Sequence, residues 1–79
     1  MEELKYYEVE FGKHNDLTDV YSICIIGKRL PRLKEAEDFC KQDVKMLGYD
    51  YVNDVEEISA EEAHSFFDMD NEANFPIFE

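Results

Sequence analysis

The sequence predicts one α+β domain with the element order β-β-α-β-α, in which a small three-stranded sheet carries two helices packed on one face. Three observations lead to this prediction. Residues 4–11 alternate between apolar and polar side chains, residues 33–47 repeat apolar side chains at helical spacing, and turn-forming residues separate such segments. A chain of 79 residues is long enough for one hydrophobic core and too short for two, so residues 1–79 are expected to be a single domain.

The first two strands are expected to form an antiparallel hairpin. Within residues 4–11, Tyr7, Val9 and Phe11 share one side of an extended chain, which is the pattern of a half-buried strand. Residues 12–19 are rich in turn formers and lead to the apolar, β-branched segment 20–26. Because both sides of this second segment are apolar, we expect it at the centre of the sheet.

One helix is expected over residues 32–47. Pro31 suits a helix start, and Gly48 follows the last apolar residue of the repeat, where a left-handed cap is needed. The apolar side chains at spacings of three and four are Leu33, Ala36, Cys40, Val44 and Leu47. This stripe is expected to pack on the sheet.

The remaining elements are a third strand, a short helix and a tail. Residues 49–58 are expected to form the third strand, with a bulge, beside the first strand and parallel to the second. Ser59 and Glu62 form a capping-box pattern that predicts a helix over residues 60–67. The acidic and aromatic tail, residues 68–79, is expected to pack on the domain or to add an edge strand.

The net charge of −12 is distributed unevenly along the chain. Residues 1–27 carry −4, residues 28–47 carry +2, and residues 48–79 carry −10 without any Lys or Arg. This asymmetry argues against direct binding to nucleic acid or to an anionic membrane, because both partners would repel the protein. The longest apolar run, residues 23–26, is far too short to span a membrane.

No pattern in the sequence indicates catalysis, a cofactor or a structural metal site. Cys24, Cys40, His14 and His64 lack the short spacing of zinc ligands, and the three glycines are isolated. Both cysteines fall on apolar segments, and the chain start does not resemble a signal peptide. We therefore expect reduced, buried thiols in a cytoplasmic protein that is not an enzyme.

The tail also carries a partial match to a calcium-binding loop. Asp68, Asp70, Glu72 and Asn74 occupy alternate positions, with Glu79 at the twelfth. The loop lacks the Gly required at its sixth position, so an acidic, solvated tail is the preferred interpretation and cation binding stays open.

The function predicted from these features is non-enzymatic binding to a basic protein surface. The acids expected to contact the partner lie in the last third of the chain: Asp50, Asp54, Glu56, Glu57, Glu61, Glu62, Asp68, Asp70 and Glu72. A small, acidic domain of this kind resembles the general type of DNA-mimic inhibitors, the anti-restriction and anti-CRISPR proteins. This resemblance implies a nuclease or another nucleic-acid-binding protein as partner.

Two alternatives remain at this stage. In the first, the protein is an accessory module that docks through its tyrosines and its apolar tail (Phe75, Ile77, Phe78), while the acids serve solubility. In the second, the basic cluster Lys28, Arg29, Arg32 and Lys34 receives an anionic ligand or the acidic segment of a second copy, so a homodimer stays open. The simpler interpretation of the cluster is pairing with the protein's own carboxylates.

Overall fold

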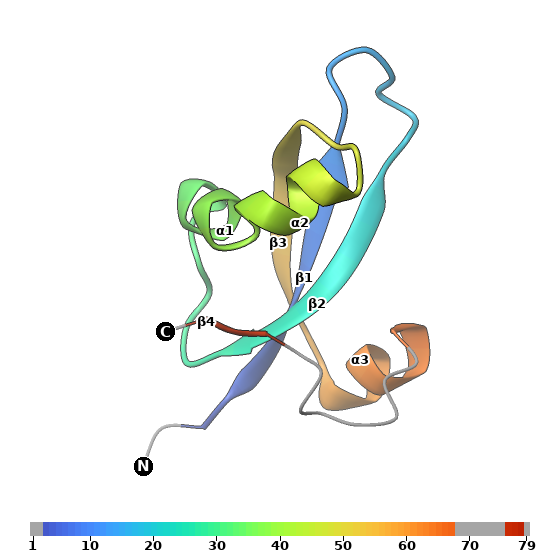
Figure 1. The fold of residues 1–79 in the computed structure, drawn as a ribbon. Helices are drawn as coiled ribbons and strands as arrows, with labels where there is room; N and C mark the ends of the chain where they lie inside the picture. The colour runs from blue at the N-terminus through green and yellow to red at the C-terminus, as the bar shows by residue number, and fades with distance from the viewer. Residues whose placement is uncertain (1–2, 68–75, 79) are drawn as a thin grey trace.

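The computed structural model describes residues 3–67 and 76–78, and these residues form a four-stranded mixed sheet with three short helices (Figure 1). Along the chain the elements are β1 (Lys5–Gly12), β2 (Tyr21–Gly27), α1 (Leu33–Phe39), α2 (Lys41–Met46), β3 (Tyr51–Ile58), α3 (Ala60–Phe66) and β4 (Ile77–Phe78). The predicted α+β class is therefore confirmed, while the number of strands and helices differs.

The strand order in the sheet is β3-β1-β2-β4, and β1 is antiparallel to both of its neighbours. The expected position of the third strand, beside the first and parallel to the second, is thus confirmed. The predicted bulge is also present: Glu10 lies opposite Asp54 and Phe11 opposite Val52, which leaves Asn53 as the additional residue.

The fourth strand, β4, is a two-residue edge strand that pairs with β2 in parallel. The backbone N–H of Ile26 donates to the Pro76 carbonyl at 2.9 Å. A Cβ atom on Gly27 would lie only 2.9 Å from the Phe78 carbonyl oxygen, so a glycine is required where β4 approaches. Residues 77–78 show both arrangements expected for the tail, because they add an edge strand and Phe78 is buried in the core.

The prediction of a single helix over residues 32–47 is wrong, because the chain bends at Cys40 and forms two helices, α1 and α2. Cys40 has φ −98° and ψ 11°, outside the helical geometry. The centre of the predicted stripe is buried, but Leu33 and Leu47 at its ends are 51% and 46% exposed. Two short helices bring the middle of the stripe onto the sheet. Gly48 has φ 83°, which confirms the predicted left-handed cap.

The two faces of the sheet are covered by different helices. The closed face, covered by α1 and α2, contains the main core with the buried side chains of Tyr7, Val9, Phe11 and Ile25. The open face carries α3, whose Ala63 packs with Cys24 of β2 and with the partly buried side chains of Tyr6, Ile26, Ile58 and Phe67. The expectation that both helices pack on one face is therefore wrong. Because β2 is apolar on both sides, each face needs a cover.

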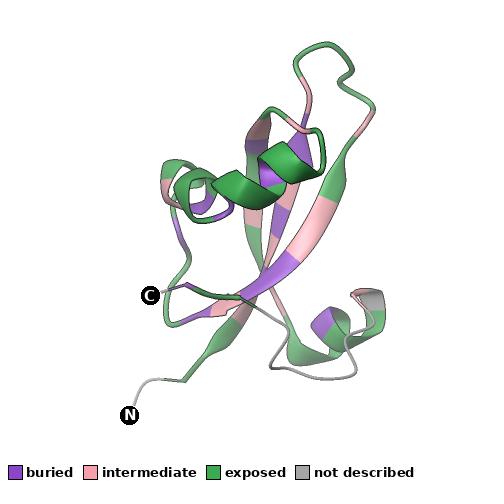
Figure 2. Cartoon of the chain, viewed as in Figure 1, coloured by how far each residue is buried: buried purple, intermediate pink, exposed green. Residues whose placement is uncertain are grey.

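Helix α3 begins at Ala60, directly after Ser59, as the capping pattern predicts. The Ser59 hydroxyl accepts a hydrogen bond from the Glu62 backbone N–H at 3.1 Å, which satisfies one of the free amides of the first turn. Figure 2 shows that buried residues follow the strands, whereas the outer surfaces of α1 and α2 are exposed. Helix α3 is short and covers only one end of the open face, beside the end of β3 (Figure 1).

Candidate functional site

The part of the open face that α3 leaves uncovered carries a set of carboxylates in strand register. In the β1–β3 pairing, Glu8 lies directly opposite Glu56, and Glu10 lies directly opposite Asp54. Side chains directly opposite each other on one face have Cβ atoms about 4.5–5.5 Å apart, and successive pairs follow about 6.6 Å along the strands. We call these four residues, Glu8, Glu10, Asp54 and Glu56, the acidic sheet face.

The acidic sheet face is accessible, and no ion pair within residues 3–67 and 76–78 neutralises it. Asp54 and Glu56 are exposed, while Glu8 and Glu10 are partly buried. Among the described residues, no Lys, Arg or His forms an ion pair with any of the four carboxylates. The Asn53 side-chain amide at the bulge donates to the Glu10 carboxylate. The four acids therefore direct a concentrated negative field toward solvent.

The pKa of Glu8 responds to the neighbouring negative charges. Partial burial raises the pKa of Glu8, and the nearby charges of Glu56, Glu10 and Glu62 raise this pKa further. A hydrogen bond with the Ser22 side chain acts in the opposite direction. The involvement of Glu62 indicates that the first turn of α3 borders the acidic sheet face. A shallow depression next to it is lined by Glu8, Val20, Tyr21, Ser22 and Phe67.

The structure separates the acids that the sequence predicted as one partner-binding set. Asp54 and Glu56 are brought together on the open face. Glu57 lies opposite Tyr7 on the closed face, where its carboxylate is 3.9 Å from the Lys5 ammonium. Glu61 and Glu62 both lie in the first turn of α3, where carboxylates also suit the helix dipole.

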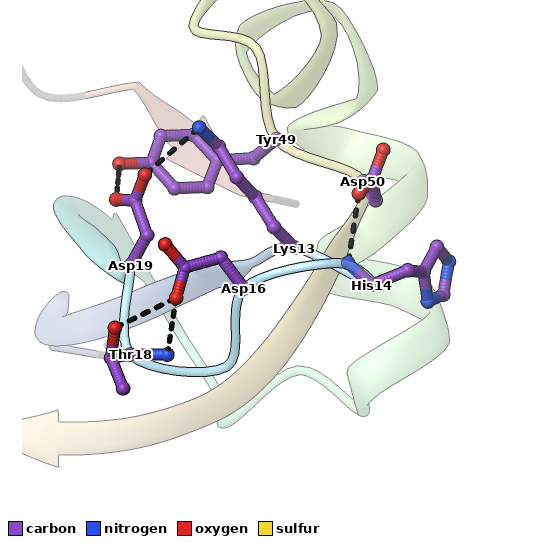
Figure 3. Close-up of polar contacts among 7 residues, drawn as sticks. All are labelled: Lys13, His14, Asp16, Thr18, Asp19, Tyr49 and Asp50. Carbon is purple, nitrogen blue, oxygen red and sulfur yellow. Dashed lines mark hydrogen bonds and ion pairs between the residues drawn. The ribbon is translucent and has the colours of Figure 1, made fainter.

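Asp50 has a structural contact at the other end of the molecule. Its carboxylate accepts a hydrogen bond from the His14 backbone N–H at 2.9 Å, which ties the β1–β2 loop to the start of β3 (Figure 3). In the same loop, Asp19 accepts a hydrogen bond from the Tyr49 hydroxyl at 2.9 Å and pairs with Lys13 at 2.8 Å. Asp50 thus takes part in loop attachment, away from the acidic sheet face.

The other three predicted partner-binding acids, Asp68, Asp70 and Glu72, lie outside the described residues, as do Asn74 and Glu79, the other two residues of the calcium-loop pattern. Within residues 3–67 and 76–78, no group of three or more His, Cys, Asp or Glu side chains has an arrangement that would hold a metal ion. No helix in this part of the chain is long and apolar enough to cross a membrane.

Sequence reasoning missed Glu8 and Glu10 as members of the site. The signal was present, because both residues lie on the polar side of the alternating first strand. Antiparallel pairing of this strand with the acidic third strand places their polar sides on one face. The distribution of charge along the chain indicates residues 48–79 as the acidic region and gives no sign that Glu8 and Glu10 join them.

The basic residues before α1 are partly used within the fold. The Arg29 guanidinium donates to both Glu35 carboxylate oxygens, at 2.9 and 2.6 Å, and lies 5.0 Å from the centre of the Phe78 ring. The Arg32 backbone N–H donates to Glu35 at 2.9 Å. The Arg29 bonds, followed by this backbone bond, lower the pKa of Glu35 to about 2. For Arg29, pairing with the protein's own carboxylate is confirmed, and it connects α1 with β4.

Both cysteines are free and buried, as the sequence predicted. Cys24 contacts α3 on the open face, and Cys40 belongs to the core of the closed face. The sheet lies between them, so they cannot form a disulfide with each other in this fold. Burial raises the pKa of each thiol to about 11, which makes both thiols poor nucleophiles at neutral pH.

Comparisons with protein-family models, with curated proteins and with solved structures found no match for this chain.

Proposed function

We propose that this protein is a non-enzymatic acidic inhibitor that occupies the basic nucleic-acid-binding groove of another protein, such as a defence nuclease. The observation that carries this proposal is the acidic sheet face, in which Glu8 faces Glu56 and Glu10 faces Asp54 on the part of the open face that α3 does not cover. The protein is in this respect a nucleic-acid mimic of the anti-restriction or anti-CRISPR type.

The energetics of the paired carboxylates support a binding role. Like charges directly opposite each other in a sheet are destabilising, and the pairwise effect is about 0.2–1 kcal/mol. Two such pairs stand side by side, without a cation from the described residues to offset them. Acids that served only solubility would be less costly if they were dispersed. A basic partner would remove this repulsion upon binding.

The charge of the acidic sheet face also suits a groove that binds nucleic acid. Duplex DNA presents about one negative charge per 1.7 Å of its axis, so proteins that bind it carry dense positive charge. Attraction over such a surface accelerates association and weakens with salt, because the Debye length is only about 8 Å at physiological ionic strength. Glu61 and Glu62 extend the negative surface onto α3.

The alternative function, docking through the apolar tail, has less support. Phe78 is only 8% exposed and belongs to the core of the closed face, where its ring packs against Phe39. Phe75 lies outside the described residues. Tyr7 is also buried, which leaves fewer aromatic side chains for a docking surface. Deletion of residues 75–79 would remove a core side chain and therefore would not test docking.

Affinity capture from the source cell tests the proposal, with a neutralised variant and a matched control. The variant combines Glu8→Gln, Glu10→Gln, Asp54→Asn and Glu56→Gln. The control combines Glu3→Gln, Asp38→Asn, Asp43→Asn and Glu57→Gln, which removes the same charge from exposed acids elsewhere. We expect the wild-type protein and the control to retain a basic protein at low salt, which high salt elutes and whose nucleic-acid binding the wild-type protein inhibits.

The neutralised variant is expected to lose this partner. Equal capture by the variant and the control would contradict the proposal, as would a partner that still binds nucleic acid in the presence of excess wild-type protein.

A further inference from the structure

The outer edge of β3 can pair with an additional strand, and it has no role in the contacts described above. In the strand order β3-β1-β2-β4, β3 is at the edge, and no strand of residues 3–67 or 76–78 pairs with its outer side. An eight-residue edge presents a row of backbone N–H and C=O groups that can pair with an additional strand. On the opposite side, β4 pairs with β2 only at Ile26 and Gly27, and the remaining β2 residues, 21–25, carry no acid that would select a basic segment.

One end of the β3 edge is already occupied by a side chain. The Glu37 carboxylate of α1 accepts a hydrogen bond from the Val52 backbone N–H at 3.5 Å. Beyond this contact, residues 53–58 continue to the end of the strand. An extended segment of six residues spans about 20 Å, which is the usual length of a strand in a sheet.

The charges on β3 select the kind of segment that fits. Asp54 and Glu56 project on the open face of the sheet, and Glu57 projects on the closed face, where it already has Lys5 as a neighbour. Pairing of this edge with the same edge of a second copy would bring two sets of these acids together, which like-charge repulsion opposes. A strand with Lys or Arg at alternate positions would instead place cations beside Asp54 and Glu56.

We propose that β3 binds an extended, Lys- or Arg-rich segment of the basic partner as an added strand along residues 53–58. This inference rests on the proposed function and specifies how the partner is held. Backbone hydrogen bonds to β3 fix the direction and register of the segment. Its basic side chains lie over the acidic sheet face, where they neutralise the paired carboxylates of β1 and β3.

Three synthetic peptides with equal charge test this mode of binding without any change to the protein. The first is a ten-residue peptide of alternating Lys and Thr. The second has the same sequence, with alternate backbone amides N-methylated so that one edge of the peptide has no N–H donors. The third combines both N-methylation patterns, so that neither edge has N–H donors. Affinity is measured by titration calorimetry at low and at high salt, and backbone hydrogen exchange of residues 53–58 is measured by NMR in each complex.

We expect the first peptide to slow hydrogen exchange in β3. The second peptide can turn its unmethylated edge toward β3, so its affinity should be close to that of the first. The third peptide should bind at least about 10-fold more weakly, because neither of its edges can donate backbone hydrogen bonds to β3.

Equal affinity of all the peptides, or unchanged exchange in β3, would overturn strand addition. If this equal affinity also decreases with salt, acidic capture survives and only the strand-addition mode fails. Absence of binding by every peptide at low salt would contradict strand addition and would also count against the proposed function.

Discussion

The closed and open faces of the sheet are built from the same strands, yet they differ in what covers them. On the closed face, α1 and α2 seal a core that includes the fully buried side chains of Val9 and Ile25. On the open face, α3 covers one end, and the acidic sheet face occupies the exposed remainder. Strand alternation thus places the main core on the closed face, while the open face keeps four carboxylates in register outside the cover of α3.

The largest expected effect comes from removing apolar volume on one face and then on the other. Ile25 is fully buried on the closed face, and its neighbour Ile26 is partly buried on the open face. We expect Ile25→Ala to lower the free energy of unfolding by about 2–5 kcal/mol, and Ile26→Ala to lower it by less. Denaturant unfolding measures both changes.

If Ile25→Ala does not fold, Ile25→Val allows the same comparison with Ile26→Val, at about 0.5–1.5 kcal/mol for the buried site. An equal decrease in the free energy of unfolding at both positions would show that the two faces contribute equally to stability, which would contradict the prediction.

The second prediction compares the two buried thiols. Cys40 is 1% exposed in the closed-face core, whereas Cys24 is 4% exposed beneath the seven-residue helix α3. Since short elements with few core contacts open more readily, we expect an alkylating reagent to modify Cys24 before Cys40 at neutral pH. Mass spectrometry of timed samples gives the order. Earlier modification of Cys40 would indicate that the closed face opens first.

The third prediction concerns the repulsion on the open face. The pKa of Glu8 is raised, chiefly by burial and then by Glu56, so protonation of Glu8 is more favourable in the folded protein. Compared with the unfolded chain, protonated Glu8 stabilises the folded protein at low pH. This contribution is lost as the pH rises through the pKa that Glu8 has in the folded protein. At pH 7, Glu8→Gln should therefore raise the melting temperature by about 1–5 °C.

This gain from Glu8→Gln should disappear in acid, where the wild-type carboxyl is protonated. Thermal melts at several pH values test it, with Glu57→Gln as the control on the other face. A melting temperature that falls at pH 7 in Glu8→Gln would mean that the ionised carboxylate stabilises the fold.

The smallest expected effect concerns Glu35 in the first turn of α1. Its pH dependence is opposite to that of Glu8. Arg29 lowers the pKa of Glu35 to about 2, below the ordinary value of 4.5. Its contribution to stability is present above about pH 4.5 and is lost as the pH falls toward 2. Glu35→Gln should lower the melting temperature slightly at pH 7, because the ion pair is exposed and such pairs contribute little.

The difference between Glu35→Gln and wild-type protein should narrow as the pH approaches 2. A constant difference across this range would show that ionisation of Glu35 is not what stabilises the start of α1.

Local patterns predicted much of this fold because they reflect local physics. The alternation from Tyr7 to Phe11 located β1, the Ser59 cap located α3, and Gly48 located the end of α2. The bend at Cys40 escaped prediction, since apolar spacing is the same whether a helix is continuous or bends at one residue. Strand β4 has only two residues, which is too short for any periodicity, so the sequence offered an edge strand as one of two arrangements of the tail.

The face occupied by α3 and the composition of the site depend on tertiary structure. The apolar second side of β2, with Cys24 and Ile26, was visible in the sequence and required a cover, but the sequence did not specify which helix would provide it. Asp54 and Glu56 were predicted as site residues from charge density. Glu8 and Glu10 became visible only through the register of β1 with β3.

The most direct test of the central claim compares two adjacent glutamates on β3 that differ in the face they occupy. Glu56 belongs to the acidic sheet face, and Glu57 lies on the closed face near Lys5. The same substitution, Glu→Gln, changes the total charge equally in both. Affinity for the captured basic partner, measured over a range of salt concentrations, should be weaker and less dependent on salt in Glu56→Gln, while Glu57→Gln should remain close to wild type. Equal weakening by both substitutions would show that total charge, and not the acidic sheet face, determines binding.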